Sequence, residues 1–514
     1  MKQNIGLILA KRAHLNPDLE GYVDGDTGAR YTFGEMNTRC NRTANALTMQ
    51  GVKPGDRVAL LMMNGIEFME SYFAVAKLGA VIVPLNWRLV PDELEFILKD
   101  SGSETLIFGS EFQENAEELH SRGDKTDLRI WIELGGEDQR MPFALDYDHL
   151  QKTAPDDEPE PGGDEDDMLY IMYTSGTTGL PKGVIHTHNT ALWGVLTIFS
   201  TAEMRYRDRY LMALPMFHVG ALTPLTVNVY GGVTSVVMRQ FDPVKTWKLI
   251  EGEKISVMLA VPAMLNFMLQ VPEFDNFDYS NLRWCMSGAA PVPVSLIESY
   301  DQIGIQIQQI YGLTETCGPA CLISPEDSIT KAGSTGKAFL HTDVRVVDEN
   351  GKDCAPGEAG EVVIRGKHVM VGYWNRPDAT AETIKDGWLY SGDVAEWDED
   401  GYIFIRDRTK DMIISGGENI YPAEIENVIL SHPKVGEVAV IGQPSETWGE
   451  SPIAVVVKAD ASLTPADVMK HCDGKLSRFK LPKGVEFIDE IPRNPSGKVL
   501  KRLLREEFPG PAPD

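Results

Sequence analysis

A glycine- and hydroxyl-rich loop in the first half of the chain could bind an anion. Residues 173–184 read YTSGTTGLPKGV and contain three glycines, one serine, three threonines and a single lysine, Lys182. Backbone N–H groups and hydroxyls can converge on an oxyanion in such a loop, and the lysine adds a point charge. We therefore predict a phosphate-binding loop. A flexible surface turn is the alternative that this stretch alone leaves open.

The loop differs from the nucleotide-binding pattern G-x-x-x-x-G-K-[ST]. Counted from Gly176, the second glycine of that pattern falls at Pro181. Lys182 is followed by Gly183, so the Ser or Thr that would hold magnesium is missing. The identity of the anion must therefore come from the rest of the chain.

Length and charge limit the classes of function. At 514 residues the chain exceeds the roughly 250–300 residues at which one hydrophobic core stops growing, so we expect more than one unit. It carries 76 acidic against 48 basic residues, a formal net charge of −28. This balance argues against nucleic acid as a partner and against electrostatic docking to a membrane, except through a local basic patch.

Cysteine usage indicates a reducing compartment, and we expect the protein in the cytoplasm. The start, MKQNIGLILAKRAHLNPD, has too short an apolar core for a signal peptide. Cys317 and Cys321 lack the nearby ligands that a zinc site needs. The six cysteines are scattered through the chain without the density of a disulfide framework: Cys40, Cys285, Cys317, Cys321, Cys354 and Cys472.

One long segment, residues 210–238, contains no Asp, Glu, Lys or Arg. It is long enough to span a bilayer, but Pro215, His218, Pro224 and a glycine pair interrupt it. We therefore expect a buried region of strands and loops and no transmembrane segment.

Strands and helices alternate along the first part of the chain, which predicts a parallel α/β sheet. Expected strands are residues 57–63, 80–84, 104–109 and 168–174, and expected helices are residues 66–79 and 91–102. The acidic, proline-rich stretch 154–167 is expected to be a solvated connection. From about Ile413 the pattern changes to that of a separate small α+β domain of about 100 residues.

Four further stretches carry groups suited to a nucleotide. YGLTETCG, residues 311–318, places an aromatic ring, a hydroxyl and a carboxylate close together, as a purine, a phosphate and a magnesium ion require. Asp393 could accept hydrogen bonds from ribose hydroxyls, and Arg408 could donate to the same sugar. SGGENIYPAEIE, residues 415–426, is a second backbone-exposing turn, and Lys498 lies on a Ser-Gly turn near the C-terminus. Each feature taken singly has a plain structural explanation.

The order and spacing of all five stretches resemble the adenylate-forming (AMP-binding) superfamily, which includes acyl-CoA synthetases, luciferases and the adenylation domains of peptide synthetases. The resemblance covers essentially the whole chain and is closest to bacterial fatty acyl-CoA synthetases. It implies an α/β fold with a large N-terminal domain of layered sheets, residues 1–409, and a small mobile α+β C-terminal domain, residues 410–514. ATP, Mg²⁺ and coenzyme A are the cofactors that it implies.

The resemblance also implies roles for individual residues. Asp393 and Arg408 match the ribose contacts, Lys410 the hinge, and Gly416 and Gly417 the path of the thiol. The phosphate loop is matched by Thr174, Ser175, Gly176, Thr177, Thr178, Gly179 and Lys182. The adenine site is matched by Gly288, Ala289, Ala290, Tyr311 and Gly312. The catalytic positions are matched by Lys498, Thr314, Glu315 and His218. Glu315 and Thr178 match the positions that contact the metal ion. The CoA nucleotide site is matched by Trp448, Phe479 and Lys483, with Leu481 where some relatives have Arg.

The same resemblance implies a two-step reaction. A carboxylic acid is first joined to AMP with loss of pyrophosphate, and the thiol of coenzyme A then attacks the acyl carbonyl. Lys498 would offset charge on the α-phosphate in the first step, and the small domain would then rotate about Lys410 before the second.

The substrate acid is expected to be apolar. The uncharged stretch LPMFHVGALTPL, residues 214–225, matches the acyl pocket, with His218 at its entrance, and contains no Arg or Lys for a second carboxylate. We predict a medium- or long-chain fatty acid. An aryl or cinnamoyl acid of the feruloyl type, or acyl transfer to a carrier-protein thiol, stays open as an alternative, as do peripheral membrane contact and a homodimer.

Overall fold

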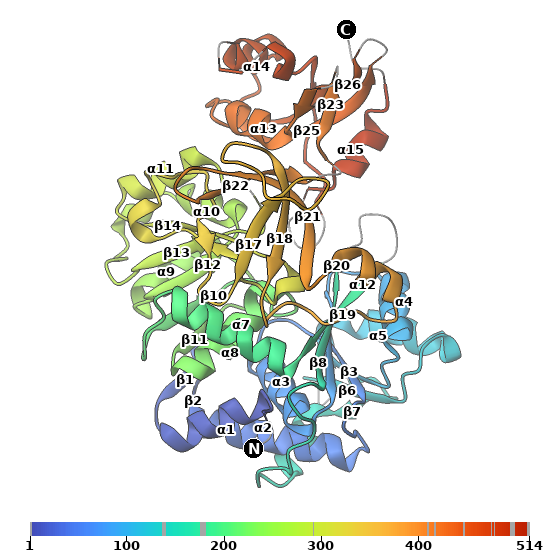
Figure 1. Cartoon of the computed structure of the whole chain (residues 1–514). Helices are drawn as coiled ribbons and strands as arrows, with labels where there is room; N and C mark the ends of the chain where they lie inside the picture. Colours follow the sequence, from blue (N-terminus) through green and yellow to red (C-terminus); the bar gives the residue numbers. More distant parts are fainter. Residues whose placement is uncertain are drawn as a thin grey trace.

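The structure is a computed structural model that describes residues 3–135, 140–174, 181–290, 292–408, 411–415, 418–445, 448–473, 475–476, 478–493 and 499–510. Figure 1 shows a large N-terminal part and a smaller C-terminal part, drawn in red and orange, at the opposite end of the molecule from the N-terminus. Asp407, in the last strand of the large part, accepts a 3.2 Å hydrogen bond from the Ala423 N–H of the small part.

An eight-stranded sheet of the large part has the order β19-β9-β8-β4-β3-β5-β6-β7. Its strands are β3 (Arg57–Leu61), β4 (Val81–Pro84), β5 (Thr105–Gly109), β6 (Ile130–Leu134), β7 (Leu145–Asp146), β8 (Met168–Thr174), β9 (Lys182–Thr187) and β19 (Gly372–Tyr373). The pairs from β4 through β7, and β4 with β8, are parallel, whereas β9 runs antiparallel to both β8 and β19. The alternating pattern of the sequence is thereby confirmed.

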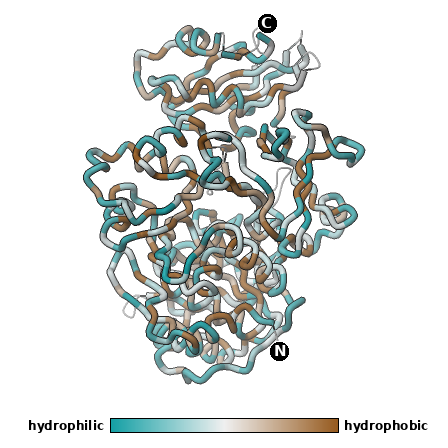
Figure 2. Tube along the Cα trace, turned by 60° about the vertical axis from the view of Figure 1, so that its left-hand side comes forward, coloured by the Kyte–Doolittle hydropathy of each residue, from teal (hydrophilic) through white to brown (hydrophobic). Residues whose placement is uncertain are grey.

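A nine-stranded sheet has the order β16-β15-β14-β13-β12-β10-β11-β1-β2. Its strands are β1 (Glu20–Asp24), β2 (Arg30–Thr32), β10 (Arg209–Met212), β11 (Thr234–Val237), β12 (Val257–Ala260), β13 (Trp284–Ser287), β14 (Ile307–Tyr311), β15 (Cys321–Leu322) and β16 (Lys337–Ala338). One apolar core contains residues of both sheets and of several helices, among them α2 (Phe33–Met49), α3 (Ile66–Leu78), α7 (His188–Thr201) and α8 (Val219–Gly231). In Figure 2 the brown, apolar stretches run through the interior and the teal stretches lie mainly at outer loops.

Further helices cover these sheets, and several begin as their sequences predict. Thr32 and Glu35 form a capping box before α2, and Pro91 opens α4 while Gly102, with φ of 64°, ends it. The other helices of the large part are α1 (Gly6–Leu15), α4 (Pro91–Ser101), α5 (Gln113–Ser121), α6 (Tyr147–Thr153), α9 (Pro243–Gly252), α10 (Pro262–Leu269), α11 (Val294–Gln302) and α12 (Pro377–Thr383).

Two five-stranded sheets complete the chain. The first is β17 (Asp343–Val347), β18 (Gly360–Arg365), β20 (Ile384–Lys385), β21 (Trp388–Trp397) and β22 (Ile403–Arg408). The second, in the small part, is β23 (Ile413–Ser415), β24 (Glu418–Ile420), β25 (Val435–Ser445), β26 (Gly449–Lys458) and β27 (Gly484–Phe487), with α13 (Pro422–Leu430), α14 (Pro465–Cys472) and α15 (Lys501–Glu507). The change of pattern at Ile413 therefore coincides with the start of β23. The domain boundary at 409/410 stays a prediction, because both residues lie outside the described part.

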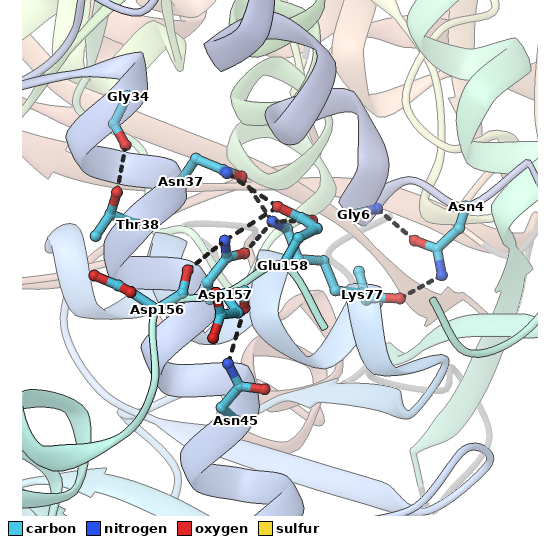
Figure 3. A network of polar contacts seen from close by, with 12 residues as sticks. Asn4, Gly6, Gly34, Asn37, Thr38, Asn45, Lys77, Asp156, Asp157 and Glu158 are labelled. Carbon is cyan, nitrogen blue, oxygen red and sulfur yellow. Dashed lines mark hydrogen bonds and ion pairs between the residues drawn. The ribbon is translucent and has the colours of Figure 1, made fainter. Parts of the chain in front are cut away.

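The acidic stretch 154–167 differs from its prediction. Its side chains at 155–158 are exposed, as expected, but its main chain is bound to α2. Asn45 donates to the carbonyls of Pro155 and Asp157, each at 2.9 Å, and the fully buried Lys77 donates to Glu158 at 2.7 Å (Figure 3). The side-chain amide of Asn45 in α2 thus supplies hydrogen-bond donors to main-chain carbonyls of a stretch whose own acidic and proline side chains have none.

The uncharged segment 210–238 forms β10, α8 and β11, so the prediction of strands and loops missed a helix. Pro224 lies inside α8. Among the helices that the structure describes, none has the length and apolarity needed to cross a membrane.

Candidate functional site

Two paired strand ends flank the predicted phosphate loop. Thr174, the last residue of β8, lies opposite Lys182, the first of β9. The Thr174 hydroxyl donates to the Lys182 carbonyl at 3.5 Å. The Lys182 ammonium lies 5.2 Å from the centre of the Tyr373 ring. These contacts hold Thr174 and Lys182 at the ends of the two strands that flank the loop.

The turn Thr314–Thr316 follows β14 and presents Glu315. The Tyr373 hydroxyl donates to Glu315 Oε1 at 2.9 Å, and the Met370 N–H donates to the Glu315 carbonyl at 2.8 Å. His186 of β9 contacts the Thr314 carbonyl through Nε2 at 2.8 Å. Because a carbonyl only accepts, His186 carries its proton on Nε2. Burial lowers the pKa of His186 to about 4, so this donor is a neutral imidazole near pH 7.

The proposed adenine contacts lie at the ends of β13 and β14, where close packing requires small residues. A Cβ on Gly288 would lie 2.3 Å from the Ile310 carbonyl oxygen, and one on Gly312 would lie 1.4 Å from the Gly318 carbonyl oxygen. Ala289 has φ of 67°, a conformation that residues other than glycine rarely adopt. Such strain is characteristic of ligand-binding turns.

Tyr311 and Asp393 are brought together from two different sheets. The Tyr311 hydroxyl donates to Asp393 Oδ2 at 2.7 Å, and Asp393 is only 4% exposed. Burial, with the neighbouring Asp393 charge, raises the pKa of Tyr311 well above its ordinary value, which keeps the phenol protonated as a donor. Asp393 of β21 pairs in register with Arg408 of β22, so the two predicted ribose contacts lie on adjacent strands.

His218 immediately precedes α8, and its place at the entrance of an acyl pocket stays a prediction. Burial, reinforced by the charge of Arg88, lowers the pKa of His218 to about 4, and Nε2 has no partner in the described part of the chain. The rings of His218 and Phe217 lie 4.4 Å apart. Thr223 of α8 donates to the Cys317 carbonyl at 2.8 Å. The apolar helix therefore begins directly beside the turn that carries Glu315.

Arg88 was missed by sequence reasoning, which placed no cation near the acyl pocket. Its guanidinium lies 4.1 Å from the Trp87 ring centre and 5.9 Å from that of Phe217. Burial lowers the pKa of Arg88. Arg88 comes from the connection after β4, so only the folded chain brings it to residues 217 and 218, and no local signal marked it.

Two predicted CoA contacts lie at the same end of β26. Trp448 precedes this strand and is 46% exposed, and its main-chain N–H donates to the Ser445 hydroxyl at 3.1 Å. The Lys483 N–H donates to the Pro452 carbonyl at 2.8 Å, just before β27 pairs with β26. An exposed indole and a lysine on one strand end fit a nucleotide base and its phosphates.

Several predicted site residues lie outside the described part of the chain, and their roles stay predictions. These are Ser175, Gly176, Thr177, Thr178, Gly179, Lys410, Gly416, Gly417 and Lys498, together with the side chains of Arg408 and Phe479.

The donor set at the turn fits Mg²⁺ held jointly with a nucleotide. Within the described residues no three His, Cys, Asp or Glu side chains gather into a metal cluster. Mg²⁺ usually binds through one or two carboxylates plus substrate phosphates and waters, and Glu315 supplies one carboxylate.

Comparisons with known proteins show the family of the chain. The family "AMP-binding enzyme" matches residues 9–374, and "AMP-binding enzyme C-terminal domain" matches residues 424–498. The chain is 46% identical to the long-chain-fatty-acid–CoA ligase FadD13 of Mycobacterium tuberculosis, over 99% of this chain and 100% of that protein. It is 39% identical to a feruloyl-CoA synthase of Amycolatopsis sp., over 98% and 99% of the two chains.

Solved structures give the same result. A Mycobacterium tuberculosis fatty acyl CoA synthetase superposes with a TM-score of 0.80 at 45% identity, covering 98% of each chain. The o-succinylbenzoate CoA synthetase of Bacillus subtilis, in complex with its acyl-adenylate intermediate, superposes with a TM-score of 0.85 at 33% identity over 97% of each chain. The resemblance inferred from the five stretches is thereby confirmed, and the chain belongs to the AMP-binding enzyme family.

Proposed function

We propose that the protein is an acid–thiol ligase that activates a medium- or long-chain fatty acid with ATP and transfers the acyl group to coenzyme A. The observation that carries the proposal is the hydrogen bond from Thr223 of α8 to the carbonyl of Cys317, the residue directly after the turn that carries Glu315. An uncharged, buried helix thus begins where the α-phosphate of a nucleotide held by Asp393 and Glu315 would react. The 46% identity to a long-chain-fatty-acid–CoA ligase supports the same acid class.

In the first step the carboxylate attacks the α-phosphorus of ATP and pyrophosphate leaves. Asp393, held by Tyr311, accepts hydrogen bonds from the ribose hydroxyls, and Lys182 with the loop after Thr174 binds the outgoing phosphates. Glu315 would hold Mg²⁺ together with the phosphates, and the ion would supply positive charge toward the phosphate oxygens. His218 is neutral and adds no charge to that of Arg88, which lies beside it at the entrance of the acyl pocket.

In the second step the CoA thiol attacks the acyl carbonyl and AMP leaves. Trp448 and Lys483 hold the CoA nucleotide in this proposal, and Gly416 and Gly417 leave room for the thiol arm. Lys498 serves only the first step, so the small domain changes its orientation between the two.

An aryl acid is the second candidate, and one observation favours it. Trp87, Phe217 and His218 form an aromatic group at the pocket entrance, with Trp87 and Phe217 6.3 Å apart and edge-on. Such a group could pack against a cinnamoyl ring, and the feruloyl-CoA synthase is 39% identical. Transfer to a carrier-protein thiol remains the alternative for the second step.

We further propose that the protein acts in the cytoplasm and contacts membranes peripherally. All six cysteines are free and buried, which suits a reducing compartment. A cavity of 580 Å³ between α1, α7 and α8 has Lys11 and Arg12 among its lining residues. Leu15 and Tyr206, which also line it, are 67% and 49% exposed. A basic, apolar edge of this kind suits an anionic bilayer despite the net charge of −28.

A substrate panel tests the proposed function. Pyrophosphate release would be measured with short, medium and long fatty acids, cinnamates, amino acids and dicarboxylates, and the thioester product identified with free CoA and with a carrier protein. We expect the fastest release with a medium or long fatty acid and efficient transfer to free CoA. Faster release with amino acids or dicarboxylates than with every apolar monocarboxylic acid would refute the pocket assignment.

A further inference from the structure

Tyr373 contacts two of the proposed ATP-binding side chains at once. Its hydroxyl donates to Glu315 Oε1 at 2.9 Å, and the Lys182 ammonium lies 5.2 Å from the centre of its ring. From this geometry we infer that Tyr373 is a positioning residue, whose hydroxyl orients the metal-binding carboxylate and whose ring holds the phosphate-binding lysine. The inference rests on the proposed function, because that function gives Lys182 and Glu315 their roles.

The strand register places Tyr373 and Lys182 on the same face of the sheet. Tyr373 of β19 lies opposite Val184 of β9, and Lys182 is two residues before Val184, so it points to the same face of the sheet. Diagonal neighbours on one face are within reach of an aromatic ring and a long side chain. The Trp374 N–H donates to the Gly183 carbonyl at 2.7 Å and extends this register by one more main-chain contact.

The turn that carries Glu315 is bound to the same two strands. The Met370 N–H donates to the Glu315 carbonyl at 2.8 Å, so the segment 370–373 holds both the main chain and the side chain of Glu315. His186, from β9, binds the Thr314 carbonyl. Lys182 and Glu315, which are far apart in sequence, therefore both contact Tyr373.

The chemistry of a tyrosine suits this place between opposite charges. Lys182 and Glu315 both contact Tyr373, and opposite charges brought to one residue attract each other; direct pairing would withdraw both from ATP and its metal. The tyrosine hydroxyl binds Glu315 without adding charge and uses only Oε1, so Oε2 keeps its lone pairs for a cation. The ring face attracts Lys182 but leaves its full positive charge for phosphate.

Two substitutions separate the hydroxyl from the ring. Tyr373→Phe keeps the ring and removes the hydrogen bond, whereas Tyr373→Leu removes both. ATP binding to the full chain would be measured by calorimetry, without acid or CoA, in EDTA and over a series of Mg²⁺ concentrations. For Tyr373→Phe we expect wild-type ATP affinity in EDTA. At low Mg²⁺ we expect a roughly tenfold weaker ATP affinity, which is the scale of one hydrogen bond to a charged group. High Mg²⁺ should restore the wild-type affinity. Tyr373→Leu should bind ATP more weakly in EDTA as well.

Tyr402→Phe is the matched control. The Tyr402 hydroxyl also donates to a carboxylate, that of Asp327, and the ammonium of Lys337 lies 4.4 Å from its ring centre. Neither Tyr402 nor its partners are assigned to the site, so this variant should bind ATP as the wild type does at every Mg²⁺ concentration. In a double-mutant cycle, adding Tyr373→Phe to Glu315→Gln should weaken Mg²⁺-dependent binding by less than twofold, because Tyr373 acts through Glu315.

An unchanged Mg²⁺ dependence of ATP binding in Tyr373→Phe would overturn the inference. So would a loss of ATP affinity that is equal in EDTA and in Mg²⁺, because that pattern belongs to a general structural role. The proposed function is tested by a different result. A wild-type chain that binds ATP with Mg²⁺ but activates no acid would refute the proposed function, and the calorimetry would still decide the role of Tyr373.

Discussion

The Tyr311 hydroxyl donates a 2.7 Å hydrogen bond to the Asp393 carboxylate and so joins the end of β14 to β21 of a different sheet. The bond fixes the orientation of a buried carboxylate, since Asp393 is only 4% exposed. Tyr311 occupies one lone-pair direction of Oδ2. A carboxylate can accept hydrogen bonds from two neighbouring hydroxyls, and a ribose presents two hydroxyls side by side.

Asp393→Ala is therefore predicted to weaken ATP binding and to slow both half-reactions, because the AMP moiety is held throughout. Loss of two charge-assisted hydrogen bonds should cost at least ~10-fold in ATP affinity. Calorimetry with ATP, together with both half-reactions, checks this. Tyr300→Phe, which removes a buried hydroxyl bonded to the Leu265 carbonyl at 2.8 Å, is the control. Unchanged ATP affinity in a folded Asp393→Ala protein would leave Asp393 with a structural role only.

Stability is predicted to fall as the pH falls from 6.5 toward 4. Burial lowers the pKa of His186, His188, His218 and His368 to about 4, below the ordinary value of 6.5. In this pH range the unfolded chain binds more protons than the folded one, so acid favours unfolding, by about 1 kcal/mol for each histidine at pH 5.5. Urea unfolding at pH 7.5 and 5.5 measures the difference.

His186→Gln keeps an N–H donor for the Thr314 carbonyl but cannot titrate. This variant should show a smaller loss of stability between pH 7.5 and 5.5 than the wild type, by about 1 kcal/mol. An identical pH dependence in the two proteins would contradict the assignment of a neutral, buried His186.

Trp448→Ala is predicted to raise the KM for CoA about tenfold and to leave adenylation unchanged, since base stacking on an aromatic ring is worth about 1–3 kcal/mol. Steady-state kinetics with varied CoA, and pyrophosphate release without CoA, separate the two effects. Trp388→Ala is a matched control, because Trp388 is covered by Arg345 and Arg365 at 5.0 and 4.4 Å and lies outside the proposed site. An unchanged KM for CoA in Trp448→Ala would remove the indole from the CoA site.

The fold was predictable where local pattern decides it. The α/β alternation, the helix that begins at Pro91 and the new unit near Ile413 all follow from periodicity, caps and turns, and the structure has them at nearly the predicted residues. The stretch 154–167 was misjudged because Asn45 and Lys77, on other segments, supply its partners. Composition carries no information about donors that distant segments provide.

The site was predictable only in part, for a related reason. Asp393 and Glu315 stand in recognisable stretches, whereas Arg88 and Tyr373 reach the site through tertiary contacts with Phe217 and Glu315. A tyrosine in a two-residue strand such as β19 has no sequence signature of its own. Its role becomes visible only when register places it beside Lys182.

Lys498 is predicted to serve the first half-reaction alone. It stands in the stretch PSGK, far in sequence from the other nucleotide contacts, and would reach the α-phosphate only in one orientation of the small domain. Gly417→Leu is the opposite case, since a bulky side chain on the thiol path should spare adenylation and depress thioester formation. Thermal melts of both variants would confirm that they fold.

The most direct test of a two-step ligase with divided domain roles is the rate of each half-reaction in Lys498→Ala. Adenylation is followed by pyrophosphate release with a fatty acid, and thioester formation by reaction of pre-made acyl-AMP with CoA. We predict at least a ~100-fold loss of adenylation, the scale for removing a preorganised charge partner, with thioester formation largely intact. Equal losses in the two steps would contradict the account and leave Lys498 as a general binding or structural residue.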